Sequence, residues 1–190
     1  MSWREPFGRL ARTIESVFPA ERELDELFAL DRPLRVKFGI DITSTDVTIG
    51  NAIPLGILGR FIELGHTAVL ILGDFTTRIG DPSGKDKTRP VLGKEQIAAN
   101  EETWLEQIGC ILDVSRAEVR HNSEWMEPMG SAELIELAGQ LTVAQMLERE
   151  SFAKRYREGT PIQLHEFLYC LVQGYDSVAI EADIELGGTD

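Results

Sequence analysis

The sequence has little cysteine and little positive charge. Its two cysteines, Cys110 and Cys170, are too few for a disulfide framework and lack metal-ligand spacing, which favours a reducing, cytoplasmic compartment. Lysine and arginine number 19 against 32 acidic residues, so the formal net charge of −13 gives no general attraction for nucleic acid. No apolar run approaches the roughly 20 residues of a membrane span, and the first 18 residues lack the apolar core of a signal peptide.

The overall composition of the sequence is typical of a globular domain. The 190 residues are 43% hydrophobic and 27% charged, which suffices for one domain with a core. Apolar positions at helical spacing run through residues 8–28, and we expect Pro19 to divide them into two helices. Residues 1–33 therefore form an N-terminal helical segment, and residues 34–190 form the main domain.

Strands and helices alternate along the main domain. Strands are predicted at residues 34–40, 66–73 and 118–121, and helices at residues 51–64, 93–111, 131–138, 142–148, 150–157 and 162–174. We expect residues 76–90 to form a loop and residues 177–186 a last strand or strand pair. This order predicts an α/β fold with a doubly wound, Rossmann-like, mainly parallel sheet. A strand that ends in GGTD at the last residue predicts a domain truncated at its C-terminal end, with exposed edges that favour aggregation unless partnered.

Three polar stretches fall where parallel strands are expected to end, the edge at which such sheets bind ligands. The first is DITSTDVTIGN, residues 41–51. A helix beginning near Gly50 would offer backbone N–H groups to an anion, with hydroxyls from Thr43 and Thr48 and a carboxylate from Asp41. The alternative interpretation is a strand–turn–helix junction in which Thr and Asp serve as caps.

The second stretch is GDFTTRIGDPSGKDKTRP, residues 73–90. Its glycines and cations favour phosphate, but only three residues separate Gly80 from Gly84, so it is not a P-loop. The G-x-G-x-x-G dinucleotide fingerprint is also absent from the sequence. The alternative interpretation is a solvated loop.

The third stretch is HEFLYCLVQGYDSVAIEADIELGGTD, residues 165–190. On a helix, spacings of three and four residues place four polar side chains on one face: Glu166, Tyr169, Gln173 and Asp176. If buried beside the sheet, this stripe needs polar partners, which a polar ligand would supply. The alternative interpretation is an exposed helix face.

Taken together, these stretches resemble a known family. The pattern DxTxxDxxxG from residue 41, the stretch at residues 73–89, HNSEW at 121–125, HEFLYCLVQGYD and ELGGTD resemble the bacterial-type tyrosyl-tRNA synthetases of class I. The resemblance extends from about residue 34 to residue 190. The tryptophan enzymes share the fold, but LVQGYD and GGTD are similar to the tyrosine branch.

The resemblance implies an incomplete class I synthetase-like nucleotide-binding domain at residues 34–190. Its activity would be the activation of tyrosine by ATP to tyrosyl-adenylate, for transfer to tRNA(Tyr). Mg²⁺ is expected to accompany ATP, without a tightly bound cofactor or a metal held by the protein. The family also implies a homodimer and no membrane partner.

The resemblance also implies residue roles. Asp81, Tyr169 and Gln173 would hold the α-ammonium of tyrosine, and Asp176 would accept its phenolic hydroxyl. The remaining residues would bind ATP (Gly39, Asp41, Thr43, Gly50, Gly188 and Asp190) or act on its phosphates (Thr48, Asn51, Lys85 and Arg89).

The chain departs from the family pattern at its signature. Where the family has His-x-Gly-His, this sequence has Thr48-Ile-Gly-Asn51, similar to many tryptophan relatives. Loss of one transition-state donor typically costs ~10²–10³ in rate. Ile42 and Cys170 stand where close relatives have proline, and Lys37 offers no evident second partner for the phenol. The family's Lys-Met-Ser-Lys-Ser-like loop would lie beyond residue 190.

Three interpretations stay open from the sequence. The chain is the N-terminal catalytic part of a tyrosyl-tRNA synthetase, which the set of motifs favours. It is a truncated or catalytically inactive module that binds tyrosine or nucleotide without turnover, which the altered signature favours. Or it is an unrelated phosphate-binding α/β enzyme, which the absence of a P-loop and of a dinucleotide fingerprint disfavours.

Overall fold

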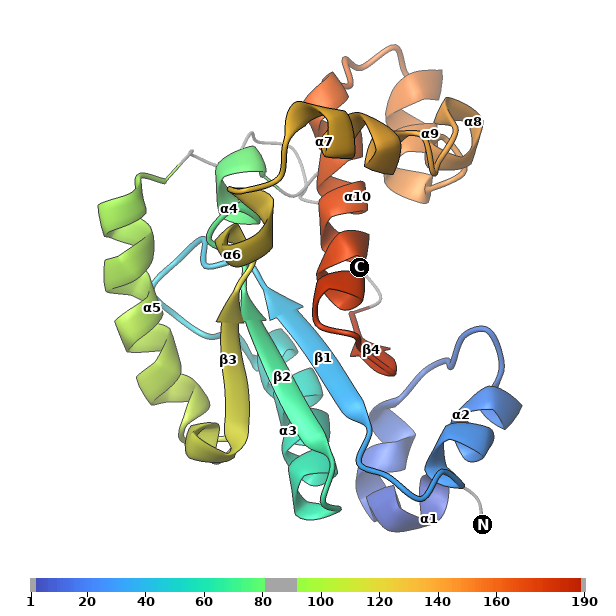
Figure 1. Ribbon diagram of the computed structural model, residues 1–190, viewed down its shortest axis with the longest axis vertical. Coiled ribbons are helices and arrows are strands. Elements are labelled where there is room, and N and C mark those ends of the chain that lie inside the picture. The colour runs from blue at the N-terminus through green and yellow to red at the C-terminus, as the bar shows by residue number, and fades with distance from the viewer. Residues whose placement is uncertain (1–2, 81–91, 189–190) are drawn as a thin grey trace.

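A four-stranded parallel sheet organises the chain. The computed structural model describes residues 3–80 and 92–188. Its strands are β1 (Arg35–Ile40), β2 (Thr67–Leu72), β3 (Ala117–His121) and β4 (Ile184–Leu186), in the order β3-β2-β1-β4, as Figure 1 shows. Every pair is parallel, with Gly39 opposite Ile71 and Phe38 opposite Leu186. This arrangement confirms the predicted α/β fold class.

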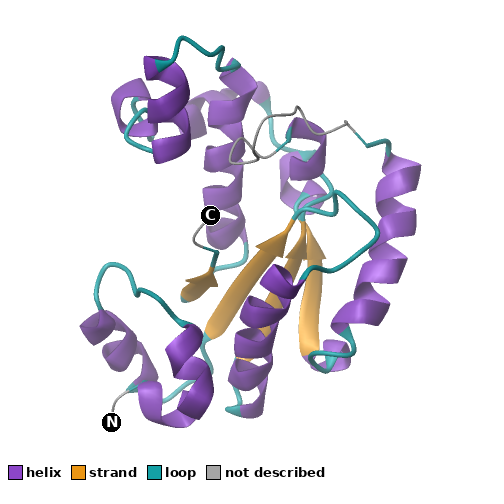
Figure 2. Ribbon diagram, turned by 180° about the vertical axis from the view of Figure 1, so that it is seen from behind, coloured by secondary structure: helices purple, strands orange, loops and turns teal. Residues whose placement is uncertain are grey.

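One face of the sheet carries the main core. Val36, Phe38 and Ile40 of β1 alternate onto this face, where the helices α3 (Ile49–Glu63) and α5 (Lys94–Ile108) cover the strands (Figure 2). The N-terminal elements α1 (Arg4–Phe7), η1 (Gly8–Thr13) and α2 (Glu21–Phe28) pack into the same cluster. Trp3 and Phe7 are almost completely buried there, so the N-terminal segment shares its core with the sheet.

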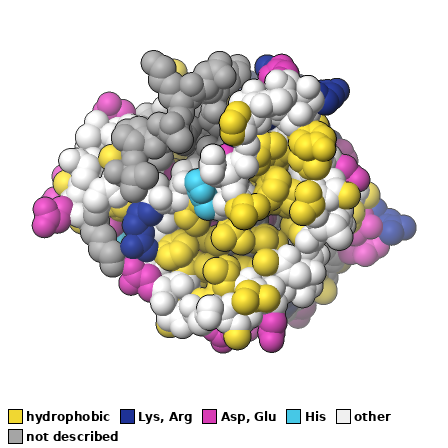
Figure 3. Space-filling view, turned by 90° about the horizontal axis from the view of Figure 1, so that it is seen from above, with side chains coloured by type: hydrophobic (Ala, Val, Ile, Leu, Met, Phe, Trp, Pro, Cys, Tyr) yellow, Lys and Arg dark blue, Asp and Glu magenta, His cyan; other side chains and the backbone are white. Residues whose placement is uncertain are grey.

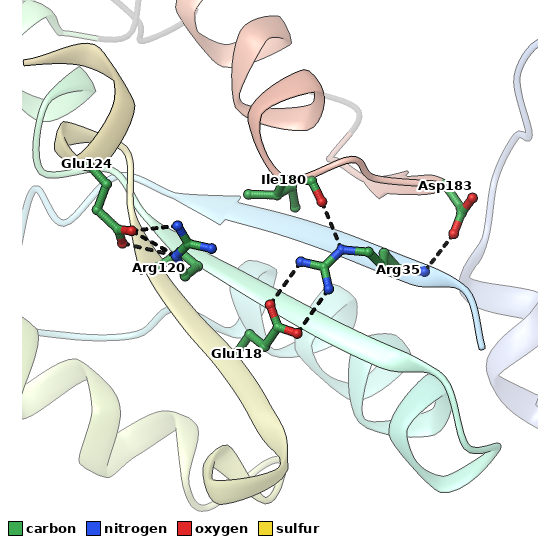
Figure 4. A network of polar contacts seen from close by, with 6 residues as sticks. All are labelled: Arg35, Glu118, Arg120, Glu124, Ile180 and Asp183. Atoms are coloured by element: carbon green, nitrogen blue, oxygen red, sulfur yellow. Dashed lines mark hydrogen bonds and ion pairs between the residues drawn. The ribbon is translucent and has the colours of Figure 1, made fainter. Parts of the chain in front are cut away.

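The other face of the sheet is more polar and lies against α10 (Leu164–Ala179). A small group of buried apolar residues, Val69, Ile71 and Ile180, joins the helix end to the strands. Below it, the Arg35 guanidinium donates to both carboxylate oxygens of Glu118 and to the Ile180 carbonyl oxygen, as Figure 4 shows. Charged side chains thus connect β1, β3 and the end of α10.

Short helices complete the fold. Those of the connections are α4 (Thr76–Ile79) and α6 (Ser123–Met126) at the carboxyl edge of the sheet, and η2 (Val114–Arg116) at the start of β3. A helical lobe of α7 (Ser131–Ala138), α8 (Val143–Met146) and α9 (Glu150–Arg157) precedes α10. The rings of Phe152 and Phe167 meet edge to face at 4.8 Å and hold α9 against α10. Among the described residues, no helix is both long and apolar enough to cross a membrane.

Most predicted elements are confirmed within a few residues, with three corrections. The first of the two helices expected in residues 8–28 is instead the short 3-10 helix η1, which follows α1. The last strand was predicted at residues 177–186, but α10 continues to Ala179 and only Ile184–Leu186 is a strand. Ile180 is buried under the sheet, and Glu181 turns the chain with a φ of 53°, so the apolar pattern here belongs to a helix end. The predicted loop at residues 76–90 begins with the one-turn helix α4, and residues 81–90 lie outside the described residues.

The central strand supplies a test of this core. Leu70 of β2 is completely buried between two strands and under α3, so Leu70→Ala should lower the free energy of unfolding by about 2–5 kcal/mol. Leu30→Ala is the matched control, because Leu30 is 46% exposed and should lose less than about 1 kcal/mol. Urea unfolding measures both, and equal losses would contradict the central position of β2.

Candidate active site

The site lies at the carboxyl end of β1. The neighbours of β1 are β2 on one side and β4 on the other, and their connecting helices lie on opposite faces, so the strand order reverses at β1. Such a reversal opens a crevice in parallel sheets. A pocket opens there, lined by Gly39, Ile40, Asp41, Ile71, Gly73, Thr76, Asn122, Tyr169, Gln173 and Asp176. Five of these residues were predicted as site residues from the sequence: Gly39, Asp41, Tyr169, Gln173 and Asp176.

Asp41 joins three elements at the mouth of this pocket. Its Oδ1 accepts a hydrogen bond from Thr76 Oγ1 at 2.6 Å, and its Oδ2 accepts one from Tyr169 Oη at 3.0 Å. The carboxylate therefore fixes α4 and α10 to the end of β1. It does not cap α3, so the capping interpretation is wrong for this residue.

Gly73 is required by this arrangement. A Cβ atom at this position would lie 2.2 Å from Asp41 Oδ1 and 2.4 Å from Thr76 Oγ1. Only glycine leaves room for the hydrogen bond between these two side chains to pass over the backbone of the strand end.

Asp176 lies deeper in the pocket and is only 3% exposed. Trp125 Nε1 donates to its Oδ1 at 2.9 Å, and Asn122 Nδ2 lies 3.4 Å from its Oδ2. Burial raises the pKa of Asp176 to about 6, and the negative charge of Asp41 adds to the rise. The Trp125 hydrogen bond, the positive charge of Lys37 and the Asn122 contact oppose it.

Asn122 connects the hydrogen bonds around Asp41 to those around Asp176. Its amide group accepts from the Phe75 backbone N–H at 2.9 Å and donates to Thr76 Oγ1 at 3.0 Å, besides its contact with Asp176. No role was predicted from the sequence for Asn122, Trp125 or Thr76. HNSEW and the threonine pair after β2 were the available signals, because both follow predicted strands whose ends meet at this edge.

The polar stripe predicted on α10 divides into two parts. Tyr169, Gln173 and Asp176 line the pocket, as the helical spacing predicted. Glu166 does not: its carboxylate forms an ion pair with Arg155 and accepts from the Gln163 backbone N–H at 2.8 Å. Glu166 therefore closes a capping box at the start of α10.

The signature residues Thr48 and Asn51 bond to each other at the start of α3. Thr48 is the N-cap, and its Oγ1 accepts from the Asn51 backbone N–H at 3.3 Å. Asn51 Oδ1 accepts in return from the Thr48 backbone N–H at 3.1 Å and from the Thr48 hydroxyl at 2.6 Å. For Thr48 the capping interpretation is thus correct, and Gly50 is exposed in the first turn.

The loop between β1 and α3 is held from behind by α5. Trp104 Nε1 donates to the Ser44 carbonyl oxygen at 2.6 Å, and Gln107 accepts from the Val47 backbone N–H at 2.9 Å. The Thr43 backbone N–H turns back onto the Asp41 carbonyl oxygen at 3.0 Å. These bonds fix the backbone that leads to Thr48.

Some predicted site residues cannot be placed. Asp81, Lys85, Arg89 and Asp190 lie outside the described residues, while Gly188 follows β4 at the same edge of the sheet. Within residues 3–80 and 92–188, no group of three or more His, Cys, Asp or Glu side chains could hold a metal ion.

Comparison with known proteins identifies the family of this fold. Residues 29–190 match the family model described as tRNA synthetases class I (W and Y). A tyrosine–tRNA ligase of Oleidesulfovibrio alaskensis is 55% identical over 173 residues, covering 91% of this chain and 44% of that protein. The ligase of Trichormus variabilis is 52% identical over 197 residues, covering 98% and 50%. The chain thus spans about half the length of the curated relatives it matches.

Solved structures agree on the fold. A truncated mitochondrial tyrosyl-tRNA synthetase of Aspergillus nidulans superposes with a TM-score of 0.78 at 22% identity, over 90% of this chain and 52% of that one. The Archaeoglobus fulgidus enzyme, solved with L-tyrosine, gives a TM-score of 0.67 at 20% identity, over 88% and 50%.

Gly73→Ala tests the geometry around Asp41. The added methyl must separate Asp41 from Thr76, so we expect the free energy of unfolding to fall by about 1–3 kcal/mol. Gly56→Ala is the control, because a Cβ there meets nothing within 4 Å and alanine inside α3 should stabilise by about 0.5–1 kcal/mol. Denaturant unfolding distinguishes the two, and a neutral Gly73→Ala would refute the contact.

Proposed function

Because this chain belongs to the class I tRNA synthetase family of the tryptophan and tyrosine enzymes, we propose that it is the catalytic-domain portion of a tyrosine–tRNA ligase. It activates tyrosine with ATP to tyrosyl-adenylate, for transfer to tRNA(Tyr). The observation that carries this proposal is the buried Asp176 carboxylate, held by Trp125 and Asn122 inside the pocket at the end of β1.

The pocket suits an amino acid with a hydroxyl at its far end. Asp176 accepts the phenolic hydroxyl of tyrosine, and a phenylalanine ring would leave this buried carboxylate without that donor. At the mouth, Tyr169 Oη donates to Asp41 and keeps a lone pair for the α-ammonium. Gln173 lines the same wall, and Asp81 completes the ammonium site in this proposal.

ATP binds at the adjoining strand ends in this proposal. Gly39, Asp41, Thr43 and Gly50 flank the turn from β1 into α3, whose N-terminus favours phosphate. Gly188 and Asp190 bind the ribose, and Mg²⁺ accompanies the nucleotide. The carboxylate of tyrosine attacks the α-phosphate in line, so catalysis consists of positioning and of stabilising charge on phosphate.

Thr48 and Asn51 supply the donors of the signature in this proposal, with Lys85 and Arg89 acting on the pyrophosphate. The hydroxyl of Thr48 now donates to Asn51, so it must leave this bond to reach a phosphate. A second candidate function follows from the same observation: a module that binds tyrosine or nucleotide without turnover, because its signature side chains cap α3 instead.

The partners of the whole protein also belong to the proposal. tRNA(Tyr) is the acceptor in the family, while this chain carries a net charge of −13 and spans half of its relatives. Basic surface for tRNA is therefore expected mainly in the remainder of the family architecture. A cytoplasmic location rests on two free cysteines, Cys110 and Cys170.

A homodimer is proposed through the helical lobe. Figure 3 shows a broad apolar area on the end of the molecule seen from above. The lobe and the start of α10 carry five exposed large apolar side chains: Ile135, Leu141, Val143, Tyr156 and Leu164. Apolar area gathered in this way marks an interface more often than a free surface, and a second copy presents the same patch.

Tyrosine-dependent ATP–pyrophosphate exchange tests the proposed activity. We expect exchange by the parent chain to be slower by about 10²–10³ than exchange by the Thr48→His/Asn51→His variant, because imidazoles reach phosphate better than a hydroxyl held in a cap. Tyrosine affinity should be equal in both, since neither residue lines the amino-acid pocket.

Other outcomes of the exchange and binding assays distinguish the candidate functions. Equal exchange in both proteins would refute the role given to Thr48 and Asn51. Tyrosine binding without exchange in either protein would favour the binding module. Absence of tyrosine binding in both, with normal melting, would refute the proposed function. Asp176→Asn in the double variant is the negative control, because it removes the charged acceptor of the phenol.

The dimer is tested by a matched pair of valines. Val143 is 63% exposed in the lobe, and Val178 is 67% exposed near the other end of α10. Val143→Glu should raise the dimer dissociation constant by about tenfold or more, whereas Val178→Glu should leave it unchanged. Sedimentation velocity measures both, and an equal effect would place the interface elsewhere.

A further inference from the structure

Lys37 places a fully buried ammonium group under the amino-acid pocket. The residue lies on β1 and is 0% exposed. Its Nζ donates to the Gln173 carbonyl oxygen at 3.1 Å and to Glu185 Oε1 at 2.8 Å. A Cβ on Gly39 would lie 3.5 Å from Lys37 Cε, so the lysine stem runs beside a residue of the pocket wall.

Structural needs do not account for a charge at this position. Moving an ammonium out of water is costly, and an apolar side chain of similar length would fill the same space at lower cost. The neighbouring strand β2 places two apolar residues, Val69 and Ile71, on the same face of the sheet as Lys37. The ammonium therefore points to an electrostatic role.

The group on which this charge acts is Asp176. Two neutral donors, Trp125 and Asn122, contact that carboxylate directly. The Lys37 ammonium is bonded to the backbone of α10 at Gln173, three residues before Asp176, and it acts on the carboxylate through its charge, as the Asp41 anion at the end of β1 does. Lys37 lowers the pKa of Asp176, while burial and Asp41 raise it to about 6. Within the described part of the chain, Lys37 is the cation that opposes this rise.

The other ionic partner of Lys37 does not cancel this effect. The Glu185 side chain is 41% exposed, so water screens its charge, and it also accepts from Ser177 Oγ at 2.8 Å. The Lys37 side chain is 1% exposed. Its charge therefore acts on the buried Asp176 carboxylate through the protein interior, where solvent screens charges less.

We propose that Lys37 is a specificity-determining residue that acts through Asp176: its buried ammonium keeps this carboxylate ionised, and an ionised carboxylate selects an amino acid whose side chain ends in a hydroxyl donor. The inference rests on the proposed function, because it concerns the choice between tyrosine and phenylalanine. It extends that function by assigning the ionisation of the acceptor to a residue outside the pocket wall.

The coupling between Lys37 and Asp176 is measurable without a ligand. The Trp125 indole N–H donates to Asp176, so its ¹H–¹⁵N resonance reports the titration of that carboxyl. We expect a midpoint near pH 6 in the parent chain and a midpoint higher by about one pH unit in Lys37→Met. Methionine matches the length of the lysine stem, and Glu185 stays solvated at its exposed edge.

Tyrosine and phenylalanine binding across pH 5–8 then tests the specificity. Below the midpoint Asp176 gains a proton, and the phenolic hydroxyl of tyrosine loses its charged acceptor. Tyrosine affinity should therefore fall by up to about tenfold per pH unit. This fall should begin about one unit higher in Lys37→Met. Phenylalanine affinity should be flat with pH in both proteins, since its ring gives Asp176 no hydrogen bond.

Glu185→Gln separates the charge of Lys37 from its ion pair. This variant breaks the pair but keeps the buried ammonium, so its Trp125 midpoint should not rise. An upward shift equal to that of Lys37→Met would overturn the proposal, as would an unmoved midpoint in Lys37→Met. If the midpoint moves but neither amino acid binds, the proposed function fails and the specificity role fails with it, although the coupling stands.

Discussion

The carboxylate of Asp41 is the interaction on which the site depends. It accepts from Thr76 on α4 and from Tyr169 on α10, so one side chain at the end of β1 fixes elements separated by 35 and 128 residues in the chain. The strand order reverses at β1, so this carboxylate lies at the crevice of the sheet. The glycine at position 73 follows from the same constraint, since any larger residue would intrude on the Asp41–Thr76 bond.

The two faces of the sheet divide stability from chemistry. The face under α3 and α5 buries a large apolar cluster, which includes the N-terminal helices. On the face under α10, a small buried apolar cluster of Val69, Ile71 and Ile180 lies beside charged and amide groups. Burying Lys37, Asn122 and Asp176 on that face lowers the free energy of unfolding. The apolar core on the opposite face offsets this loss. Such a compromise is common where a fold must hold polar groups in fixed positions.

The sequence predicted those features that depend on local periodicity. The apolar run of β2 and the spacing of Tyr169, Gln173 and Asp176 lie within single elements, so pattern alone located them. Thr76, Asn122 and Trp125 come from separate elements and meet only through the register of the parallel strands, so no local pattern revealed their contacts. The burial of Lys37 was hidden for the same reason.

Under the proposed function, helix capping and phosphate binding compete for the side chains of Thr48 and Asn51. Threonine is among the favoured N-cap residues and histidine is not, so Thr48 stabilises the start of α3 by about 1 kcal/mol relative to a poor cap. The Thr48 hydroxyl and the Asn51 amide oxygen satisfy each other and the helix N–H groups in the free protein. A donor that already holds a good bond must break it to reach a phosphate, and that cost enters the activation free energy. The two side chains thus stabilise the start of α3 at the position to which the proposed function assigns donors for phosphate.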